Sequence, residues 1–250
     1  MTSGPEWPSG YRRLHFATID STNEEARRLA ERGEPGPVWI QADMQTAGRG
    51  RRGRAWDSPS GNLAATLFLR PGKPAGDCAQ LSFVAALAVS DALTAVSSAI
   101  DVRLKWPNDV LANGKKIAGI LLESASAGRE TPSWLAVGIG VNLARFPDET
   151  EFPATSLVAL GARAPLAEDF LTVLAAAFAK WYEAWTGRGF AEIRDAWLAR
   201  AAGLGTRIRA RLQNEEIFGV FEGIDEKGAL VLRTDMARAR VIAAGDVFFG

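Results

Sequence analysis

The chain has 250 residues, of which 47% are apolar and 23% charged, a balance typical of one or two globular domains rather than of a disordered or fibrous chain. Its 29 basic residues are matched by 29 acidic ones, so the basic excess that is typical of general nucleic-acid-binding proteins is missing. With one cysteine and one histidine, the chain cannot form an internal disulfide or a zinc site that needs two histidines. We therefore expect a cytoplasmic globular protein whose chemistry does not depend on cysteine or histidine.

We expect no segment that directs export or crosses a membrane. Residues 1–10 are polar and contain proline, without the apolar run that follows the basic start of a signal peptide. The longest apolar-rich stretch, Leu81–Val96, is interrupted by Ser82, Ser90, Asp91 and Thr94. It is expected to be too short and too polar to span a bilayer.

Hydrophobic spacing predicts both strands and helices in the first 200 residues. Residues 21–24 (Ser-Thr-Asn-Glu) have the pattern of a capping box, which predicts the start of a helix that ends near Gly33. The dipeptide at 113–114 (Asn-Gly) predicts a hairpin turn. The further elements, in chain order, are a strand at 38–42, a long loop at 46–61, a strand at 63–69, a helix at 77–96, strands at 100–106, 117–122 and 134–142, and helices at 166–186 and 190–201.

The pattern changes near residues 203–205 (Gly-Leu-Gly). The last 45 or so residues contain only strand and turn signals, with strands predicted at 207–212, 217–224, 229–233 and 240–249. We therefore expect an α+β protein with two domains: a mixed sheet with helices over residues 1–202, and a small β-barrel over residues 203–250.

The long loop contains the pattern G-x-G-x-x-G at residues 48–53, which superficially matches a dinucleotide-binding fingerprint. That fingerprint must open a helix, whereas residues 55–61 (Ala-Trp-Asp-Ser-Pro-Ser-Gly) cannot, and a strand follows them. Four of the six residues at 49–54 are arginines. They form either a solvated or RNA-tethering basic loop or an anion clamp, in which guanidinium groups bind a carboxylate or phosphate.

A second group of charged residues brackets the predicted hairpin. Residues 105–109 (Lys-Trp-Pro-Asn-Asp) end one strand, and the chain returns past Lys116, so the hairpin should bring Lys105, Asn108, Asp109 and Lys116 together. A surface turn with paired charges is the alternative interpretation. Glycines within the strand at 134–142 weaken it unless a side chain or ligand approaches closely.

Five segments together resemble one family, the biotin protein ligases. They occur in that family's order and spacing, whereas each alone is a weak signal. The segments are 20–23 (Asp-Ser-Thr-Asn), 45–56 (Gln-Thr-Ala-Gly-Arg-Gly-Arg-Arg-Gly-Arg-Ala-Trp), 105–109 (Lys-Trp-Pro-Asn-Asp), 116–121 (Lys-Ile-Ala-Gly-Ile-Leu) and 138–142 (Gly-Ile-Gly-Val-Asn).

The resemblance implies a fold and a set of site residues. The expected fold is a class II synthetase-like mixed sheet with helices, followed by an SH3-like C-terminal domain. No metal-binding set of side chains is implied. By resemblance, biotin would be bound by Ser21, Thr22, Asn23, Gln45, Arg49, Gly50, Arg51 and Lys116, and the nucleotide by Arg54, Trp56, Asn108 and Asn142. Catalysis would fall to Lys116, Arg51 and Asp109.

The reaction implied is ATP-dependent. Biotin and ATP, with Mg²⁺, form biotinyl-AMP and pyrophosphate, and a lysine of a biotin carboxyl carrier protein, such as that of acetyl-CoA carboxylase, then accepts the biotin. Only about 15 residues precede the matching region, so we expect neither the DNA-binding domain of some family members nor DNA binding; a membrane partner is not expected either. Both a monomer and a homodimer stay open. The alternatives are a lipoate or octanoate ligase or transferase of the same superfamily, and a non-enzymatic RNA-binding module.

Overall fold

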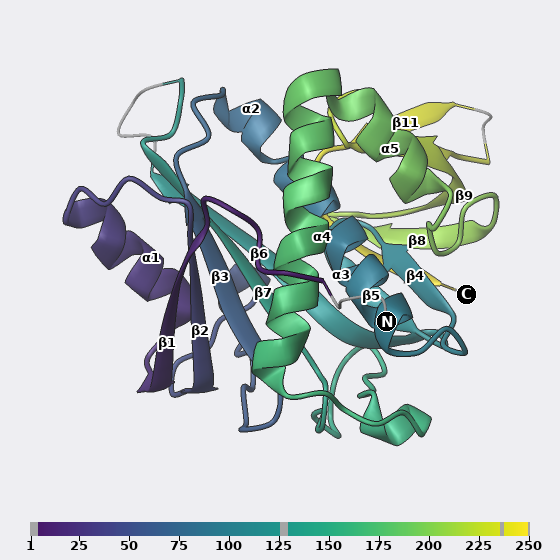
Figure 1. Cartoon of the computed structure of the whole chain (residues 1–250). Helices are drawn as coiled ribbons and strands as arrows, with labels where there is room; N and C mark the ends of the chain where they lie inside the picture. Colours follow the sequence, from purple (N-terminus) through teal and green to yellow (C-terminus); the bar gives the residue numbers. More distant parts are fainter. Residues whose placement is uncertain (1–4, 126–129, 236–237, 250) are drawn as a thin grey trace.

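The computed structural model describes residues 5–125, 130–235 and 238–249. They form a mixed seven-stranded sheet with helices on both faces and a separate five-stranded antiparallel sheet (Figure 1). This arrangement confirms the expected α+β fold class.

The larger sheet has the strand order β1-β2-β3-β7-β6-β5-β4. Its first two strands are parallel because helix α1, Thr22–Glu31, crosses between them, and all other neighbours are antiparallel. The strands are β1 Arg12–Ile19, β2 Val38–Gln45, β3 Leu63–Leu69, β4 Val102–Lys105, β5 Asp109–Ala112, β6 Lys115–Ala125 and β7 Trp134–Val141.

Both faces of this sheet are covered, because successive side chains of each strand point to opposite faces. On one face, Val38, Ile40 and Phe68 pack with Ala26 and Leu29 of α1. Residues of the same strands that point the other way belong to the main core, which contains the longer helices. In Figure 1, α1 lies at the left of the sheet, and α3 and α4 cross it near the centre. The helices after α1 are α2 Ala75–Cys78, α3 Leu81–Val96, α4 Ala167–Arg188 and α5 Phe190–Leu198.

Helix α3 is apolar on nearly every side because it lies inside the core, against α4 and the strands β4 to β7. Ala75–Val96 is long and apolar enough to meet the length and hydropathy requirements of a membrane span. The sequence prediction considered only Leu81–Val96 and expected it to be too short and too polar. However, 67% of that apolar window is buried inside the protein.

The smaller sheet has the order β11-β10-β9-β8-β12 and packs beside α5. Its strands are β8 Arg207–Arg211, β9 Glu216–Ile224, β10 Leu230–Arg233, β11 Ala239–Ile242 and β12 Asp246–Phe249. Among the contacts that tie it to the rest of the chain, two involve buried tryptophans. Trp106 Nε1 donates a hydrogen bond of 2.9 Å to the carbonyl of Gly228, and the rings of Trp197 and Phe221 meet edge to face.

Several local predictions need correction. The strand predicted at 240–249 is two strands, β11 and β12, which pair at opposite edges of the smaller sheet. The helix predicted at 77–96 is two helices, α2 and α3, with residues 79–80 between them. Strand β1, which has polar residues and lies at an edge, and the short β5 were not predicted. Helix α1 begins after Ser21 as expected, but no side-chain capping bond forms, and Glu24 pairs with Arg27 instead. The Asn113–Gly114 hairpin turn is confirmed, and both residues have positive φ.

Candidate active site

A cavity of about 350 Å³ opens on the α1 face of the larger sheet, which is within the size range of small-molecule sites. Its floor follows from the strand register. Beneath the middle of α1, the residues that lie side by side across β2, β3, β7 and β6 are Val38, Phe68, Ala136 and Glu123. Four residues further along β2, on the same face, the corresponding row is Ala42, Ala64, Gly140 and Gly119. Because the side chains become smaller along the strands, the sheet surface is hollow where α1 begins.

Two glycines of β7 make room for particular side chains. A Cβ at Gly140 would lie 2.3 Å from the indole of Trp56, and a Cβ at Gly138 would lie 2.3 Å from Oδ1 of Asn23. The Trp56 ring also lies over Gly119. The glycines within this strand are therefore explained by close approach of a loop side chain and a helix side chain.

One end of the cavity is formed by uncharged hydrogen-bonding groups. Thr22, Asn23 and Gln45 line it, and the buried Ser58 and Thr66 support them from behind; we call these five residues the polar end. The backbone N–H of Thr22 donates to Gln45 Oε1 at 2.8 Å, and Gln45 Nε2 donates to Ser58 Oγ at 2.8 Å. The Thr66 hydroxyl lies 2.8 Å from Thr22 Oγ1 and 2.6 Å from Asn23 Oδ1. These groups are largely buried, so each depends on its partners in the protein.

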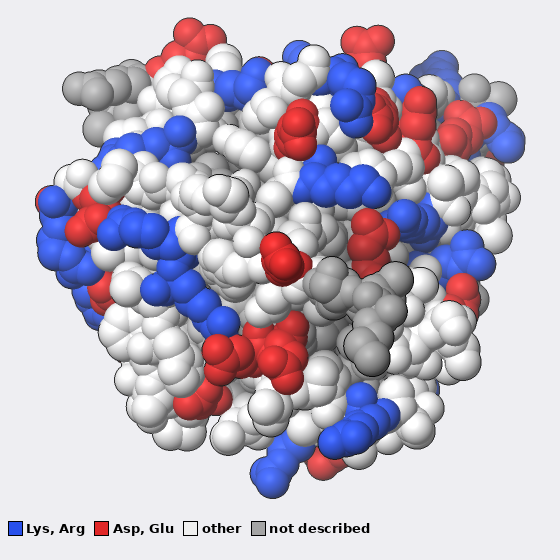
Figure 2. All heavy atoms as spheres, in the orientation of Figure 1, with Lys and Arg blue, Asp and Glu red and all other residues white. Residues whose placement is uncertain are grey.

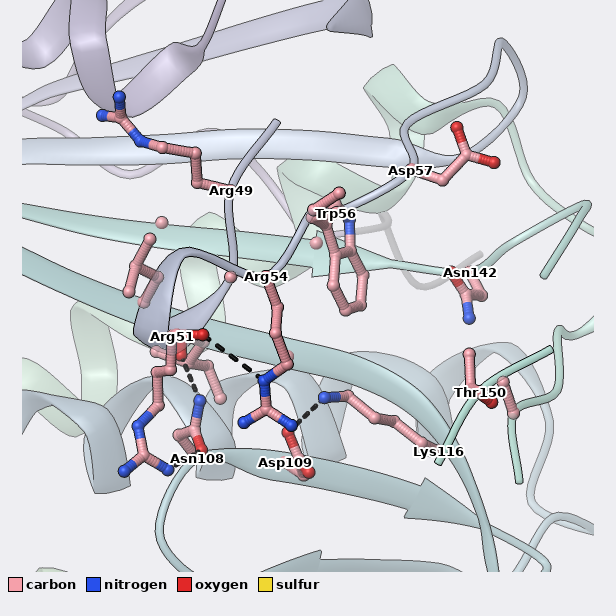
Figure 3. A pocket seen from close by; sticks show the side chains of 18 of the residues that line it. Arg49, Arg51, Arg54, Trp56, Asp57, Asn108, Asp109, Lys116, Asn142 and Thr150 are labelled. Carbon is pink, nitrogen blue, oxygen red and sulfur yellow. Dashed lines mark hydrogen bonds and ion pairs between the residues drawn. The ribbon is translucent and has the colours of Figure 1, made fainter. Parts of the chain in front are cut away.

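The other end is lined by ionised groups from both sheets. We call Arg51, Arg54, Lys105, Asp109, Lys116 and Asp246 the charged end. Asp109 accepts from Lys116 Nζ at 2.6 Å and lies 3.4 Å from Lys105 Nζ. A register shift between Val110 and Leu111 places Lys116 on the same side as Asp109. The predicted cluster of Lys105, Asn108, Asp109 and Lys116 is therefore present (Figure 3).

Lys105 is almost fully buried, with 6% of its side chain exposed. Its ammonium lies 3.9 Å from the ring centroid of Phe152 and 5.8 Å from that of Phe248, so two aromatic faces replace part of its hydration. Burial lowers the pKa of Lys105, and Asp109 opposes that effect.

The arginine-rich loop divides between the two ends. Arg49 lies near Glu24 and Glu123, at 3.3 and 3.6 Å, and points away from Arg51 and Arg54 in Figure 3. Arg51 donates to Asn108 Oδ1 at 3.1 Å. The loop therefore does not act as one block of four arginines.

Asp246, the first residue of β12, faces the other loop arginines. Its carboxylate lies 3.5 Å from Arg51, 3.0 Å from Arg52 and 3.3 Å from Arg54, and Arg211 of β8 adds a contact at 3.6 Å. Burial acts to raise the pKa of Asp246, but the four guanidinium groups outweigh it and hold the pKa below its usual range. One carboxylate of the smaller sheet thus orders the loop over the larger one.

Every residue predicted from the sequence to belong to the site lines this cavity. Their individual roles stay predictions. The sequence did not point to several other residues that line or support it, among them Ser58, Thr66, Glu123, Phe152, Asp246 and Phe248. Several of them lie within strands, such as Thr66 of β3, Glu123 of β6 and Asp246 of β12, and none belongs to a recognisable motif, so no local signal marked them.

Comparison with known proteins places the chain. Residues 15–142 match the Biotin/lipoate A/B protein ligase family, and residues 203–250 match the Biotin protein ligase C terminal domain. The chain is 52% identical over 241 residues to the biotin–[acetyl-CoA-carboxylase] ligase of Paracoccus denitrificans, an alignment that covers 94% of this chain and 99% of that one. The chain belongs to the biotin/lipoate A/B protein ligase family. It is therefore an enzyme of the ligase class, as its five motifs predicted.

Other family members agree with this assignment. The chain is 36% identical to the biotin–[acetyl-CoA-carboxylase] ligase of Mycobacterium tuberculosis over 96% of this chain and 90% of that one. A biotin protein ligase from Aquifex aeolicus, solved in complex with biotin and ATP, superimposes with a TM-score of 0.82 at 29% identity and covers 95% of this chain and 97% of its own. The ligase family fold therefore extends over both sheets.

Proposed function

We propose that this family member is a cytoplasmic biotin–[acetyl-CoA-carboxylase] ligase with a catalytic domain at residues 1–202 and an SH3-like domain at 203–250. One observation carries the proposal: a single cavity joins an uncharged polar end to a charged end. Biotin has the same two-part chemistry, because a neutral cyclic urea lies at one end and a carboxylate at the other. The 52% identity to the Paracoccus ligase supports the same substrate class.

The site residues take the roles implied by the family. Biotin lies along the polar end, with its carboxylate toward Arg51 and Lys116, and the nucleotide lies beside Trp56. The proposed biotin-binding residues are Ser21, Thr22, Asn23, Gln45, Arg49, Gly50, Arg51 and Lys116, and the proposed nucleotide-binding residues are Arg54, Trp56, Asn108 and Asn142.

The first step joins biotin's carboxylate to the α-phosphate of ATP and releases pyrophosphate. A carboxylate with an ordinary pKa of about 4 is already ionised at pH 7, so this step needs no general base. Its obstacle is the repulsion between two anions. Arg51 and Lys116 reduce that repulsion and fix the geometry, because fixed cations in a partly dry site stabilise developing charge strongly.

In the second step a carrier lysine, which must react as the neutral amine, attacks the acyl carbon of the adenylate. An amide bond forms, the bond from that carbon to the phosphate oxygen breaks, and AMP leaves together with the proton of the amine. Asp109 is our candidate to orient that amine or accept its proton. Lys105 and Lys116 each contact a different oxygen of its carboxylate, and because each oxygen can accept about two hydrogen bonds, the carboxylate has capacity left for a third amine. An Asp109→Asn variant should transfer preformed biotinyl-AMP to the carrier about 10- to 100-fold more slowly. Transfer at the normal rate would remove Asp109 from this step.

Mg²⁺ would enter with the nucleotide rather than occupy a site of its own. Among residues 5–125, 130–235 and 238–249, no three His, Cys, Asp or Glu side chains are placed to hold a metal ion together. Asp109 and Asp246 face cations of the protein. Mg²⁺ commonly keeps its waters and binds phosphate oxygens, and bound there it would neutralise phosphate charge.

The proposed macromolecular partner is a biotin carboxyl carrier domain, and neither DNA nor a membrane is proposed as a partner. The protein would act as a monomer or as a homodimer. On the face shown in Figure 2, basic and acidic side chains are interspersed, so that face carries no continuous basic patch of the kind that binds RNA.

ATP–pyrophosphate exchange tests the proposal directly. Biotin should support exchange, and lipoate and octanoate should not. Exchange with lipoate alone would replace biotin ligation by lipoate ligation within the same family, and exchange with none of the three acids would overturn the proposed reaction.

A further inference from the structure

The hydrogen bonds of the polar end form a chain whose direction can be derived from its last member, Glu123. Asn23 Nδ2 lies 2.7 Å from Glu123 Oε2. An ionised carboxylate can only accept hydrogen bonds, so the amide nitrogen of Asn23 must face it. The amide oxygen then faces Thr66, at 2.6 Å. Gly138 leaves the space in which this amide lies, because a Cβ there would meet Oδ1 at 2.3 Å.

The orientation of Asn23 decides where the hydroxyl hydrogens point. Oδ1 of Asn23 has no hydrogen, so Thr66 must donate its single hydrogen to it. The 2.8 Å contact between Thr66 and Thr22 therefore needs its hydrogen from Thr22. Gln45 Oε1, at 3.1 Å from the Thr22 hydroxyl, already accepts the backbone N–H of Thr22 at 2.8 Å and does not need that hydrogen.

The result is a defined pattern of donors and acceptors at the cavity wall. Thr22 Oγ1 has used its hydrogen, so it can only accept from a ligand. Gln45 uses Oε1 for Thr22 and one N–H for Ser58, so a second N–H is left to donate. An acceptor beside a donor matches the N–H and C=O of a cyclic urea. A dithiolane ring or an alkyl chain offers neither group.

We propose that Glu123 and Thr66 are positioning residues that set this pattern and thereby select the urea ring of biotin. The inference rests on the proposed function. Asn23 transmits the effect, since its amide oxygen and one of its amide hydrogens are bonded within the protein. Thr66 is fully buried, with 0% exposed surface, so it acts on the ligand only through its neighbours.

The main test compares Thr66→Val with Thr66→Ser. Valine keeps the shape of threonine but removes the donor to Asn23 Oδ1 and the acceptor of the Thr22 hydroxyl hydrogen. The buried amide oxygen then lacks a partner and the Thr22 hydrogen is no longer fixed, so the KM for biotin in pyrophosphate exchange should rise about 10- to 100-fold. Thr66→Ser keeps the hydroxyl and should stay within about threefold of the unaltered protein. Desthiobiotin, which keeps the urea but lacks the sulfur ring, should be weakened by the same factor as biotin, whereas kcat and the KM for ATP should change little.

A second pair of variants covers the case in which Thr66→Val does not fold. Glu123 is about one-third exposed, at 35%, so the protein should tolerate Glu123→Gln. The glutamine amide can donate as well as accept, so Asn23 could turn its amide oxygen toward residue 123 and its N–H toward Thr66, which would reverse the direction of the hydrogen bonds. The KM for biotin should rise about 3- to 10-fold. Glu24→Gln is the matched control, because Glu24 also contacts Arg49, at 3.3 Å, but is not part of the chain. It should leave the KM for biotin within about twofold.

The outcomes separate this proposal from the one on which it rests. No exchange with biotin in the unaltered protein would overturn the proposed function and this inference with it. Exchange in the unaltered protein, together with equal KM values for biotin in Thr66→Val and Thr66→Ser, would overturn the positioning role alone. Equal increases in the KM for biotin in Glu123→Gln and Glu24→Gln would also overturn the positioning role, because the contact that both carboxylates share is the one with Arg49.

Discussion

The two ends of the cavity are built in different ways. The polar end comes from α1, β2, β3 and Ser58, which follows the arginines in the 46–61 loop, with Glu123 of β6 as its anchor. The charged end is assembled from the same loop, the β4–β6 hairpins and β12 of the second sheet. Uncharged groups at the polar end bond directly to one another, whereas each charge at the other end faces an opposite charge, in several cases from a distant segment.

This difference follows from the cost of burial. A buried hydroxyl or amide needs only one or two hydrogen-bonding neighbours, which adjacent strands supply. A buried ion needs an opposite charge as well. At the charged end that requirement draws in Asp246, which lies 192 residues after Arg54 in the chain. We therefore expect the polar end to determine which acid binds, and the charged end to determine how fast it reacts.

Lys116→Gln should show the largest effect. In the proposed first step Lys116 lies beside the reacting phosphate, so its removal should lower kcat/KM for pyrophosphate exchange about 100- to 1000-fold, or about 3–4 kcal/mol. Lys115→Gln is the matched control, because Lys115 is the adjacent residue of β6 and is exposed. It should stay within about twofold. Equal losses in both variants would mean that only the total charge of the strand matters.

Adding a methyl group to Gly138 or to Gly140 of β7 should affect the two ends of the cavity separately. Gly140→Ala would displace Trp56 and should raise the KM for ATP about 10- to 100-fold, whereas Gly138→Ala would displace the Asn23 amide and should raise the KM for biotin by a similar factor. Gly187→Ala is the control, since nothing lies within 4 Å of its added Cβ and alanine is well tolerated in the last turn of α4, where Gly187 lies. If Gly138→Ala and Gly140→Ala both raised the KM of the same substrate, the two ends would not bind different substrates.

How far the sequence predicted this site depends on the range of its interactions. The Asn113–Gly114 turn has a strong local signal, and it positions Asp109 against Lys116 as expected. The role of Asp246 depends on how the second sheet packs against the first, and neither composition nor periodicity contains that information. The same limit explains the strand predicted at 240–249, whose two halves pair at opposite edges of a sheet.

Asp246→Asn should weaken the connection between the two sheets. Four arginines would lose their shared carboxylate, and the free energy of unfolding should fall by about 1–2 kcal/mol. Breaking a fully buried ion pair costs about 3–5 kcal/mol. Because the side chains of Arg52 and Arg54 are 43% and 52% exposed, solvent screens part of their attraction to Asp246 and the cost is smaller. Urea unfolding measures the change. Asp235→Asn removes the partner of Arg207, an exposed pair on the same smaller sheet, and should leave the unfolding midpoint unchanged.

The pH dependence of that stability difference is the smallest effect and tests its electrostatic origin. Because the surrounding arginines hold the pKa of Asp246 below its usual range, its contribution should be fully present above the unfolded-state pKa of about 4. It should then be lost as the pH falls through the lower pKa of the folded state. The difference in unfolding free energy between the unaltered protein and Asp246→Asn should therefore be constant from pH 7 to about pH 4 and shrink below it. A difference that persisted undiminished below pH 3 would show that Asp246 acts by packing or hydrogen bonding, because a protonated carboxyl retains both.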